Sequence, residues 1–192
     1  MIAVYFQRKQ GINMHLQGNF ENNLAEAFNL MNTGKINKAI DLFENLTEKY
    51  PKTAKGFHLK AYAYTQDNNF KKALESIEIA KRISPDSLDI NFDYANILSS
   101  IGRKKEALRN LKSIENKYKQ DARIYYNLGC LSIDIENYKD AIEYLKRTLE
   151  LDPENKQASF NIGVSFFNTE QYEKTIKIFQ AYQKEFGVSF EA

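Results

Sequence analysis

The chain has 192 residues, of which 43% are apolar and 27% charged, and this composition is typical of a folded chain. Its formal net charge of +2 gives no electrostatic basis for a nucleic-acid or membrane partner, because phosphate binding needs a concentrated basic face. One cysteine and two histidines exclude an intramolecular disulfide and leave little with which to build a metal site or a histidine-dependent catalytic triad. We therefore expect no metal and no cofactor.

The N-terminal segment, 1–19, does not share the pattern of the rest. Its longest apolar run, Met1 to Phe6, is far shorter than the roughly 20 residues that cross a bilayer. The run is also too short for a secretion signal, whose basic residues would precede it. We expect a soluble, cytoplasmic protein in which residues 1–19 form either an irregular cap or a mobile segment.

From residue 20 onward, a pattern of small and large residues recurs at every thirty-fourth position. Each unit has a small residue, a second position that is small in four units, a large apolar residue, and in four units a helix-stopping residue near its end. The first small residues are Ala27, Ala61, Ala95, Gly129 and Gly163, and the second positions are Ala39, Ala73, Ala107, Ala141 and Thr175. The large apolar residues are Phe43, Ile77, Leu111, Leu145 and Phe179. The positions near the ends of the units are Pro51, Pro85, Lys119, Pro153 and Gly187. The predicted units are 20–53, 54–87, 88–121, 122–155 and 156–189, followed by a tail, 190–192.

Each unit predicts two helices joined by a tight turn. In residues 122–155, two sets of apolar and small residues recur at spacings of three and four: Tyr125, Leu128, Gly129 and Ser132, then Tyr138, Ala141, Ile142, Leu145 and Leu149. Predicted turn residues are Gly34, Asn68–Asn69, Gly102 and Asn137, and predicted N-caps of the first helices are Asn19, Thr53, Ser87, Asp121 and Asn155. The small residues predict close helix crossings at Ala27 with Ala39 and at Gly129 with Ala141.

This arrangement resembles the tetratricopeptide repeat, whose pattern is an aromatic residue, Leu-Gly and Tyr, then Ala, Phe and Pro. The matching residues are Tyr125, Leu128–Gly129, Tyr138, Ala141, Leu145 and Pro153, although no unit has the family's Trp. The resemblance implies an all-α, right-handed superhelical solenoid of five tandem helix-turn-helix repeats over residues 20–189. It also implies a non-enzymatic scaffold or adaptor whose first helices line a concave groove for a peptide or a partner's helix.

A stripe along the first helices is the predicted peptide-binding site. It combines aromatic rings, which can take apolar side chains, with asparagine amides, which can donate to and accept from a peptide backbone. Its members are His58, Tyr62, Phe92, Asn96, Arg123, Tyr126, Asn127, Phe160 and Asn161. The alternative interpretation is that these residue types are common in the family's average sequence and indicate no ligand.

Other chemistry has little support in the sequence. Some family members hold a partner's C-terminal carboxylate with cationic side chains, but here Phe92, Gln157 and Asn161 stand at those positions. The sequence contains no phosphate-binding loop, metal-spaced cluster or nucleophile elbow, so we expect no enzyme. We interpret the basic residues between Arg103 and Lys119 as a solvated convex face.

The last predicted helix is apolar on a face that a further unit would cover, through Ile176, Phe179, Tyr182 and Phe186. Arrays of this kind normally finish with a polar capping helix, and Ser189 stands where the next N-cap would be. Either the chain is cut from a longer array, or this face pairs with a second copy or another partner. The alternative function is therefore a structural assembly or oligomerisation module.

Overall fold

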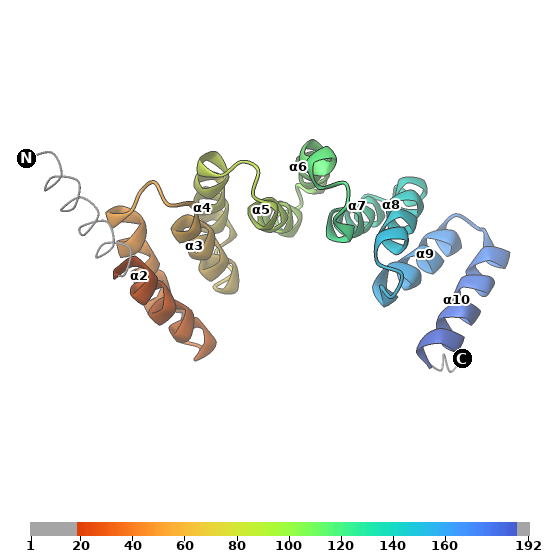
Figure 1. Cartoon of the computed structure of the whole chain (residues 1–192), viewed down its shortest axis with the longest axis horizontal. Coiled ribbons are helices and arrows are strands. Elements are labelled where there is room, and N and C mark those ends of the chain that lie inside the picture. The colour runs from red at the N-terminus through yellow and green to blue at the C-terminus, as the bar shows by residue number, and fades with distance from the viewer. Residues whose placement is uncertain (1–18, 188–192) are drawn as a thin grey trace, which may run out of the picture. The chain divides into compact units, whose positions relative to one another are not determined.

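The computed structural model describes residues 19–187, and this range is helical throughout, with no strand (Figure 1). A first helix occupies residues 19–32 and is followed by α2 (Ile36–Lys49), α3 (Ala54–Gln66), α4 (Phe70–Ile83), α5 (Leu88–Ser100), α6 (Lys104–Ile114), η1 (Glu115–Tyr118), α7 (Ala122–Asp134), α8 (Tyr138–Leu151), α9 (Lys156–Asn168) and α10 (Tyr172–Phe186). The all-α prediction is confirmed.

Helices that follow one another in the chain also pack together. Close contacts join α3 to α4, α7 to α8 and α9 to α10, and further contacts join α2 to α3 and α8 to α9. The starts of α3, α5, α7 and α9 are equally spaced along the chain, and those of α2, α4, α6, α8 and α10 have the same spacing. Contacts divide the chain into two compact units, Met1–Ile97 and Leu98–Ala192, and each is described below by itself.

The turn between the two helices of each hairpin uses one residue in the left-handed conformation. These residues recur with the period of the helices, at Gly34 (φ 73°), Asn68 (φ 58°), Gly102 (φ 80°), Glu136 (φ 61°) and Glu170 (φ 60°). Asn137, predicted to lie near this turn, directly follows its left-handed residue, Glu136. It also caps α8, because its side chain accepts a hydrogen bond from the Asp140 amide.

The predicted caps of the first helices have mixed outcomes. Asp121 accepts from the Arg123 amide and Asn155 accepts from the Ala158 amide, as expected of N-caps. The Thr53 side chain makes no such bond, and the Gly56 amide donates to the Thr53 carbonyl oxygen instead. The prediction for Asn19 is also wrong, since residue 19 is already helical.

The unit that lacks a proline at position 119 has a different second helix. Here α6 has 11 residues, whereas α2, α4 and α8 have 14 each. The chain continues from α6 as the short 3-10 helix Glu115–Tyr118 before α7 begins.

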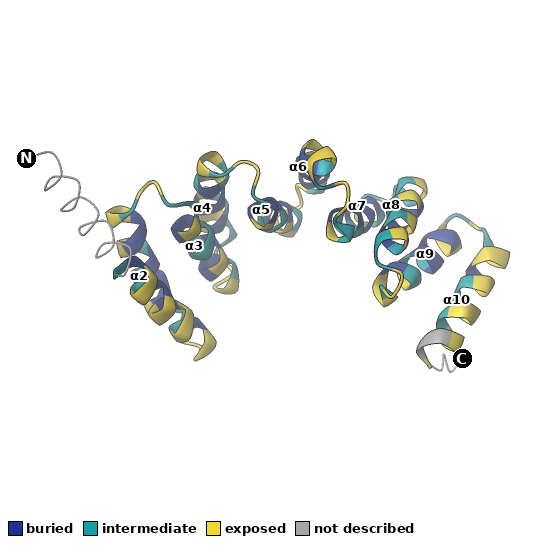
Figure 2. Cartoon of the chain, in the orientation of Figure 1, coloured by how far each residue is buried: buried dark blue, intermediate teal, exposed yellow. Residues whose placement is uncertain are grey.

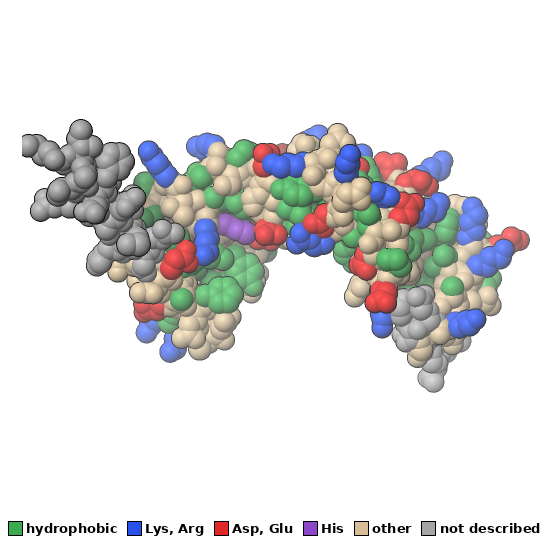
Figure 3. All heavy atoms as spheres, in the orientation of Figure 1, with side chains coloured by type: hydrophobic (Ala, Val, Ile, Leu, Met, Phe, Trp, Pro, Cys, Tyr) green, Lys and Arg blue, Asp and Glu red, His purple; other side chains and the backbone are tan. Residues whose placement is uncertain are grey.

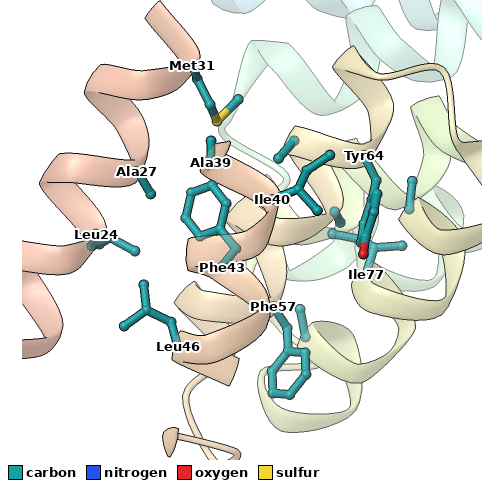
Figure 4. Packing of buried hydrophobic residues seen from close by; sticks show 14 of the residues in the cluster. Leu24, Ala27, Met31, Ala39, Ile40, Phe43, Leu46, Phe57, Tyr64 and Ile77 are labelled. Carbon is teal, nitrogen blue, oxygen red and sulfur yellow. The ribbon is translucent and has the colours of Figure 1, made fainter. Parts of the chain in front are cut away.

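The core of each hairpin is a layer of buried side chains between its two helices, seen in Figure 2 as dark blue. In Figure 4 the fully buried ring of Phe43 lies on the side of α2 that faces the helix carrying Ala27. Leu46 and Ile77 are also fully buried in this cluster. The small residue on the first helix therefore makes room for the large residue 16 positions later.

The same contact recurs at two glycines in the second compact unit. A Cβ atom on Gly129 would lie 2.7 Å from Leu145 Cγ, and one on Gly163 would lie 2.7 Å from the Phe179 ring. The predicted crossing of Gly129 with Ala141 is therefore corrected. All three atoms nearest to the Gly129 Cβ position belong to Leu145, whose longer side chain fills the space between the helices.

Two glycine substitutions test this contact by moving stability in opposite directions. Gly129→Ala should lower the free energy of unfolding by about 1–3 kcal/mol, because its methyl group overlaps the fully buried Leu145. Gly56→Ala should raise it by about 0.5–1 kcal/mol, because the nearest atom there, Thr47 Cγ2, is 3.5 Å away and alanine favours the helix. Urea unfolding followed by circular dichroism measures both, and shifts of the same sign would contradict the packing described.

Candidate functional site

All nine residues predicted to bind a peptide lie on first helices, and none is fully buried. In the unit of residues 1–97, His58 and Tyr62 lie on α3, and Phe92 and Asn96 lie on α5. In the unit of residues 98–192, the others lie on α7 and α9: Arg123, Tyr126, Asn127, Phe160 and Asn161. The predicted stripe thus includes residues of four helices, and its residues in the two compact units are described separately.

His58 bridges α3 and α5 through a carboxylate. Its Nε2 atom lies 2.6 Å from Asp93 Oδ2, and the two side chains are 19% and 39% exposed. Figure 3 shows a group of green apolar side chains on the surface of the N-terminal part of the described chain, with red and blue charged side chains around it. The imidazole is thus held by a partner, while part of the Asp93 carboxylate still faces solvent.

An apolar hollow, which we call the Phe28 hollow, lies between the helix of residues 19–32 and α3. It has a volume of about 390 Å³ and is lined by Glu21, Leu24, Ala25, Phe28, Lys55 and Leu59. The Phe28 side chain is 46% exposed, and Lys55 Nζ lies 2.9 Å from Glu21 Oε2. This hollow was not among the predicted sites, although the apolar residues at these stripe positions were visible in the sequence.

A second, smaller hollow, which we call the Asp93 hollow, lies between α3 and α5. It has a volume of about 140 Å³ and is lined by Tyr62, Thr65, Asp93, Asn96 and Ile97. It brings together two predicted residues, Tyr62 and Asn96, with the carboxylate that His58 contacts. Tyr62 is 41% exposed, so its ring is available as one wall.

In the second compact unit, Tyr126, Cys130 and Asn161 form a cluster between α7 and α9. The Asn161 amide donates to Cys130 Sγ at 3.6 Å. Burial raises the pKa of the Tyr126 phenol to about 12, with a further contribution from Cys130. Burial also raises the pKa of the Cys130 thiol above its ordinary value, and the charge of Asp134 adds to this effect. The cluster stabilises neutral groups, and it gives Cys130 no activation as a nucleophile.

The other predicted polar residues of α7 interact within their own helix end. The Asn127 side chain donates to the Arg123 carbonyl oxygen at 2.8 Å. The Arg123 guanidinium lies 2.7 Å from Asp121 Oδ2, and this contact holds the pKa of the Asp121 carboxyl below its ordinary value.

The predicted assembly face of α10 is only partly turned outward. Phe179 fills the space at Gly163, and its ring centroid lies 5.5 Å from that of Phe160, while the Tyr182 centroid lies 6.1 Å from the same ring. These two rings therefore pack against α9 and are half-buried, and the assembly face stays a prediction. Ile176 is 57% exposed, and the side chain of Phe186 lies outside the described part of the structure.

The described residues contain no group of three or more metal-ligating side chains placed to hold a metal ion. Over residues 19–187, no helix has the length and apolar character needed to cross a bilayer.

Comparison with known families agrees with this geometry. Models described as tetratricopeptide repeat match residues 17–87, 122–155 and 157–187. The chain is a tetratricopeptide repeat protein. Tetratricopeptide repeat protein 13 of Homo sapiens is 28% identical over 163 residues, which are 82% of this chain and 19% of that protein. Intraflagellar transport protein 70A of Xenopus laevis is 21% identical over 183 residues, 80% of this chain and 28% of that protein. The chain thus spans less than a third of these relatives.

Solved tetratricopeptide repeat structures share the fold. MamA from Desulfovibrio magneticus RS-1, residues 41 to the end, has a TM-score of 0.77 at 16% identity, covering 86% of this chain and 93% of that one. YrrB, described as a protein with an unusual peptide-binding site, has a TM-score of 0.70 at 18% identity, with 84% of each chain covered. Proteins of this family generally mediate protein–protein interactions.

Cysteine labelling tests the Tyr126–Cys130–Asn161 cluster of this tetratricopeptide repeat protein. Because burial raises the thiol pKa, Cys130 holds less thiolate than a free thiol at pH 8, and its reaction with iodoacetamide should be slower than that of glutathione. The rate should keep rising above pH 9. Asp134→Asn should speed labelling by removing a charge that raises this pKa, whereas Glu143→Gln on the exposed side of α8 should not. A rate equal to that of glutathione would contradict the described environment.

Proposed function

We propose that this tetratricopeptide repeat protein is a non-enzymatic scaffold or adaptor that binds a peptide or a helix of a partner protein along the predicted peptide-binding stripe of its first helices. The observation that carries the proposal is the pair of hollows on either side of α3, one apolar and one containing a carboxylate, which are open surfaces beside a packed core. Extended segments and amphipathic helices bind to surfaces of this kind through side chains that enter such hollows.

We also propose that residues 20–189 are organised as five units of equal length. The recurrence of helix starts and of the left-handed turn residue supports this division. A cytoplasmic location remains a prediction from the sequence. The asparagines contribute unequally to the proposed stripe, since Asn127 donates to its own helix while Asn161 contacts the neighbouring α7.

Paired substitutions in the two hollows test this function. The double variant Phe28→Ala, Tyr62→Ala should weaken binding of a partner captured from native lysate by about 1–2 kcal/mol, because it removes the exposed rings that line the two hollows. Glu143→Ala with Lys146→Ala, on the exposed side of α8, is the matched control and should leave binding unchanged. Isothermal titration calorimetry with the recombinant partner measures both, and equal effects of the two double variants would contradict a first-helix binding site.

A second candidate function, assembly through α10, is favoured by one comparison of exposure. Ile142 on α8 is 5% exposed, whereas Ile176, at the equivalent position of the next hairpin, is 57% exposed. Phe167 and Tyr172 are 59% and 54% exposed beside it, and their ring centroids lie 5.8 Å apart. An exposed apolar patch of this kind is typical of an interaction surface.

Sedimentation equilibrium tests self-assembly through this patch. If the patch joins two copies, the average mass should rise from one chain to two with increasing concentration, and Ile176→Glu should abolish this rise because a carboxylate would be buried in the contact. Ile101→Glu is a matched control at a turn, where the native isoleucine is 37% exposed. A mass of one chain at all concentrations would contradict self-assembly.

A further inference from the structure

The two hollows flank α3 on the same compact unit. The Phe28 hollow takes residues from the helix of residues 19–32 and from α3, and the Asp93 hollow takes residues from α3 and α5. Leu59 lines the first and Tyr62 lines the second, and these residues are one turn apart on α3. A single segment that crosses α3 therefore meets both.

The Phe28 hollow fits a large uncharged side chain. Its walls are supplied by leucine, alanine and phenylalanine side chains, with Phe28 nearly half exposed. Its two charged lining residues, Glu21 and Lys55, form an ion pair with each other. Their charges cancel, so the hollow offers buried apolar contact and no net charge to an incoming group.

The Asp93 hollow fits a cationic side chain. Among its lining residues one is anionic, Asp93, and none is cationic. The Tyr62 ring forms another wall, and a lysine or arginine head gains from both a carboxylate and an aromatic face. His58 contacts the same carboxylate at 2.6 Å and restrains its position. A carboxylate on the incoming segment would be repelled by Asp93.

The spacing of the helices sets the spacing of the two side chains. Packed helices lie about 8–10 Å apart. The α3 residues that line the two hollows are also offset along the helix axis, from Lys55 and Leu59 to Tyr62 and Thr65, by about 7–10 Å at 1.5 Å per residue. The hollows are therefore about 11–14 Å apart. An extended β segment rises about 3.3 Å per residue with alternate side chains on one face, so residues four apart lie on one face at about 13 Å. An α-helical segment would need residues about eight or nine apart to cover the same distance.

We propose that the helix of residues 19–32, α3 and α5 together bind an extended segment of a partner protein that carries a large apolar side chain and, four residues away, a lysine or arginine. The apolar side chain enters the hollow beside Phe28, and the cation enters the hollow beside Asp93 and Tyr62. This inference rests on the proposed function and specifies the chemistry of the partner.

Selection from a random dodecapeptide library displayed on phage, with the full chain as bait, tests the proposal. Enriched sequences should pair Leu, Met or Phe with Lys or Arg at a spacing of four. With the Asp93→Asn variant as bait, the enrichment of Lys and Arg should be lost while the enrichment of the apolar residue remains. With the Phe28→Ala variant as bait, the enrichment of the apolar residue should be lost while that of Lys and Arg remains. Glu75→Gln, on the exposed side of α4, and Ile101→Ala, in the other unit, are matched controls that should leave the enriched sequences unchanged.

A fluorescein-labelled copy of the most enriched peptide gives the size of each effect. Fluorescence anisotropy should show affinity falling about tenfold for Asp93→Asn and about fivefold for Phe28→Ala. Circular dichroism should show both variants folded, because both side chains are substantially exposed.

The outcomes separate this inference from the proposed function. Enrichment of acidic residues, a spacing of eight or nine, or retention of Lys and Arg on Asp93→Asn would overturn the inference. Binding of such peptides that still depends on Tyr62 or Phe28 would leave the proposed function in place. Peptides that bind but are unaffected by any first-helix variant, or a library with no binders above background, would count against both.

Discussion

The structure depends on one steric constraint, the close approach of the two helices in each hairpin. A small residue on the first helix leaves room for a large apolar residue 16 positions later, as Gly129 does for Leu145 and Gly163 does for Phe179. Interiors of this density tolerate little added volume, so the contact fixes how each first helix is rotated. That rotation turns the opposite stripe of the first helix outward, where Tyr62 and Phe28 are exposed.

The parts of the peptide-binding stripe that lie on the two compact units offer different chemistry. On residues 19–97 they present two hollows and a partly exposed carboxylate, Asp93. On residues 98–187 the corresponding polar side chains bond to one another or to their own helix, as Asn161 does to Cys130 and Asn127 does to α7. A partner therefore meets more exposed apolar and anionic surface around α3 than along α7.

The recurring pattern predicted the helices well, because small, large and helix-stopping residues at a fixed spacing can be identified from the sequence alone. It could not predict which side chain fills the space at Gly129, since Ala141 and Leu145 lie on the same face one turn apart and only side-chain length decides. It also missed the hollow around Phe28, because a hollow depends on volumes from two helices rather than on one position. The contact of His58 with Asp93 joins two different helices of the array and likewise needs the packed hairpins.

The central claim is that the predicted peptide-binding stripe of the first helices is the surface that binds a partner. Chemical-shift mapping by two-dimensional NMR of the full chain, titrated with a bound partner peptide, tests it most directly. The account predicts that perturbed amides fall on the helix of residues 19–32, α3, α5, α7 or α9, centred on the residues that line the two hollows. Perturbations centred on the exposed sides of α4, α6 or α8, with the first helices unchanged, would contradict it.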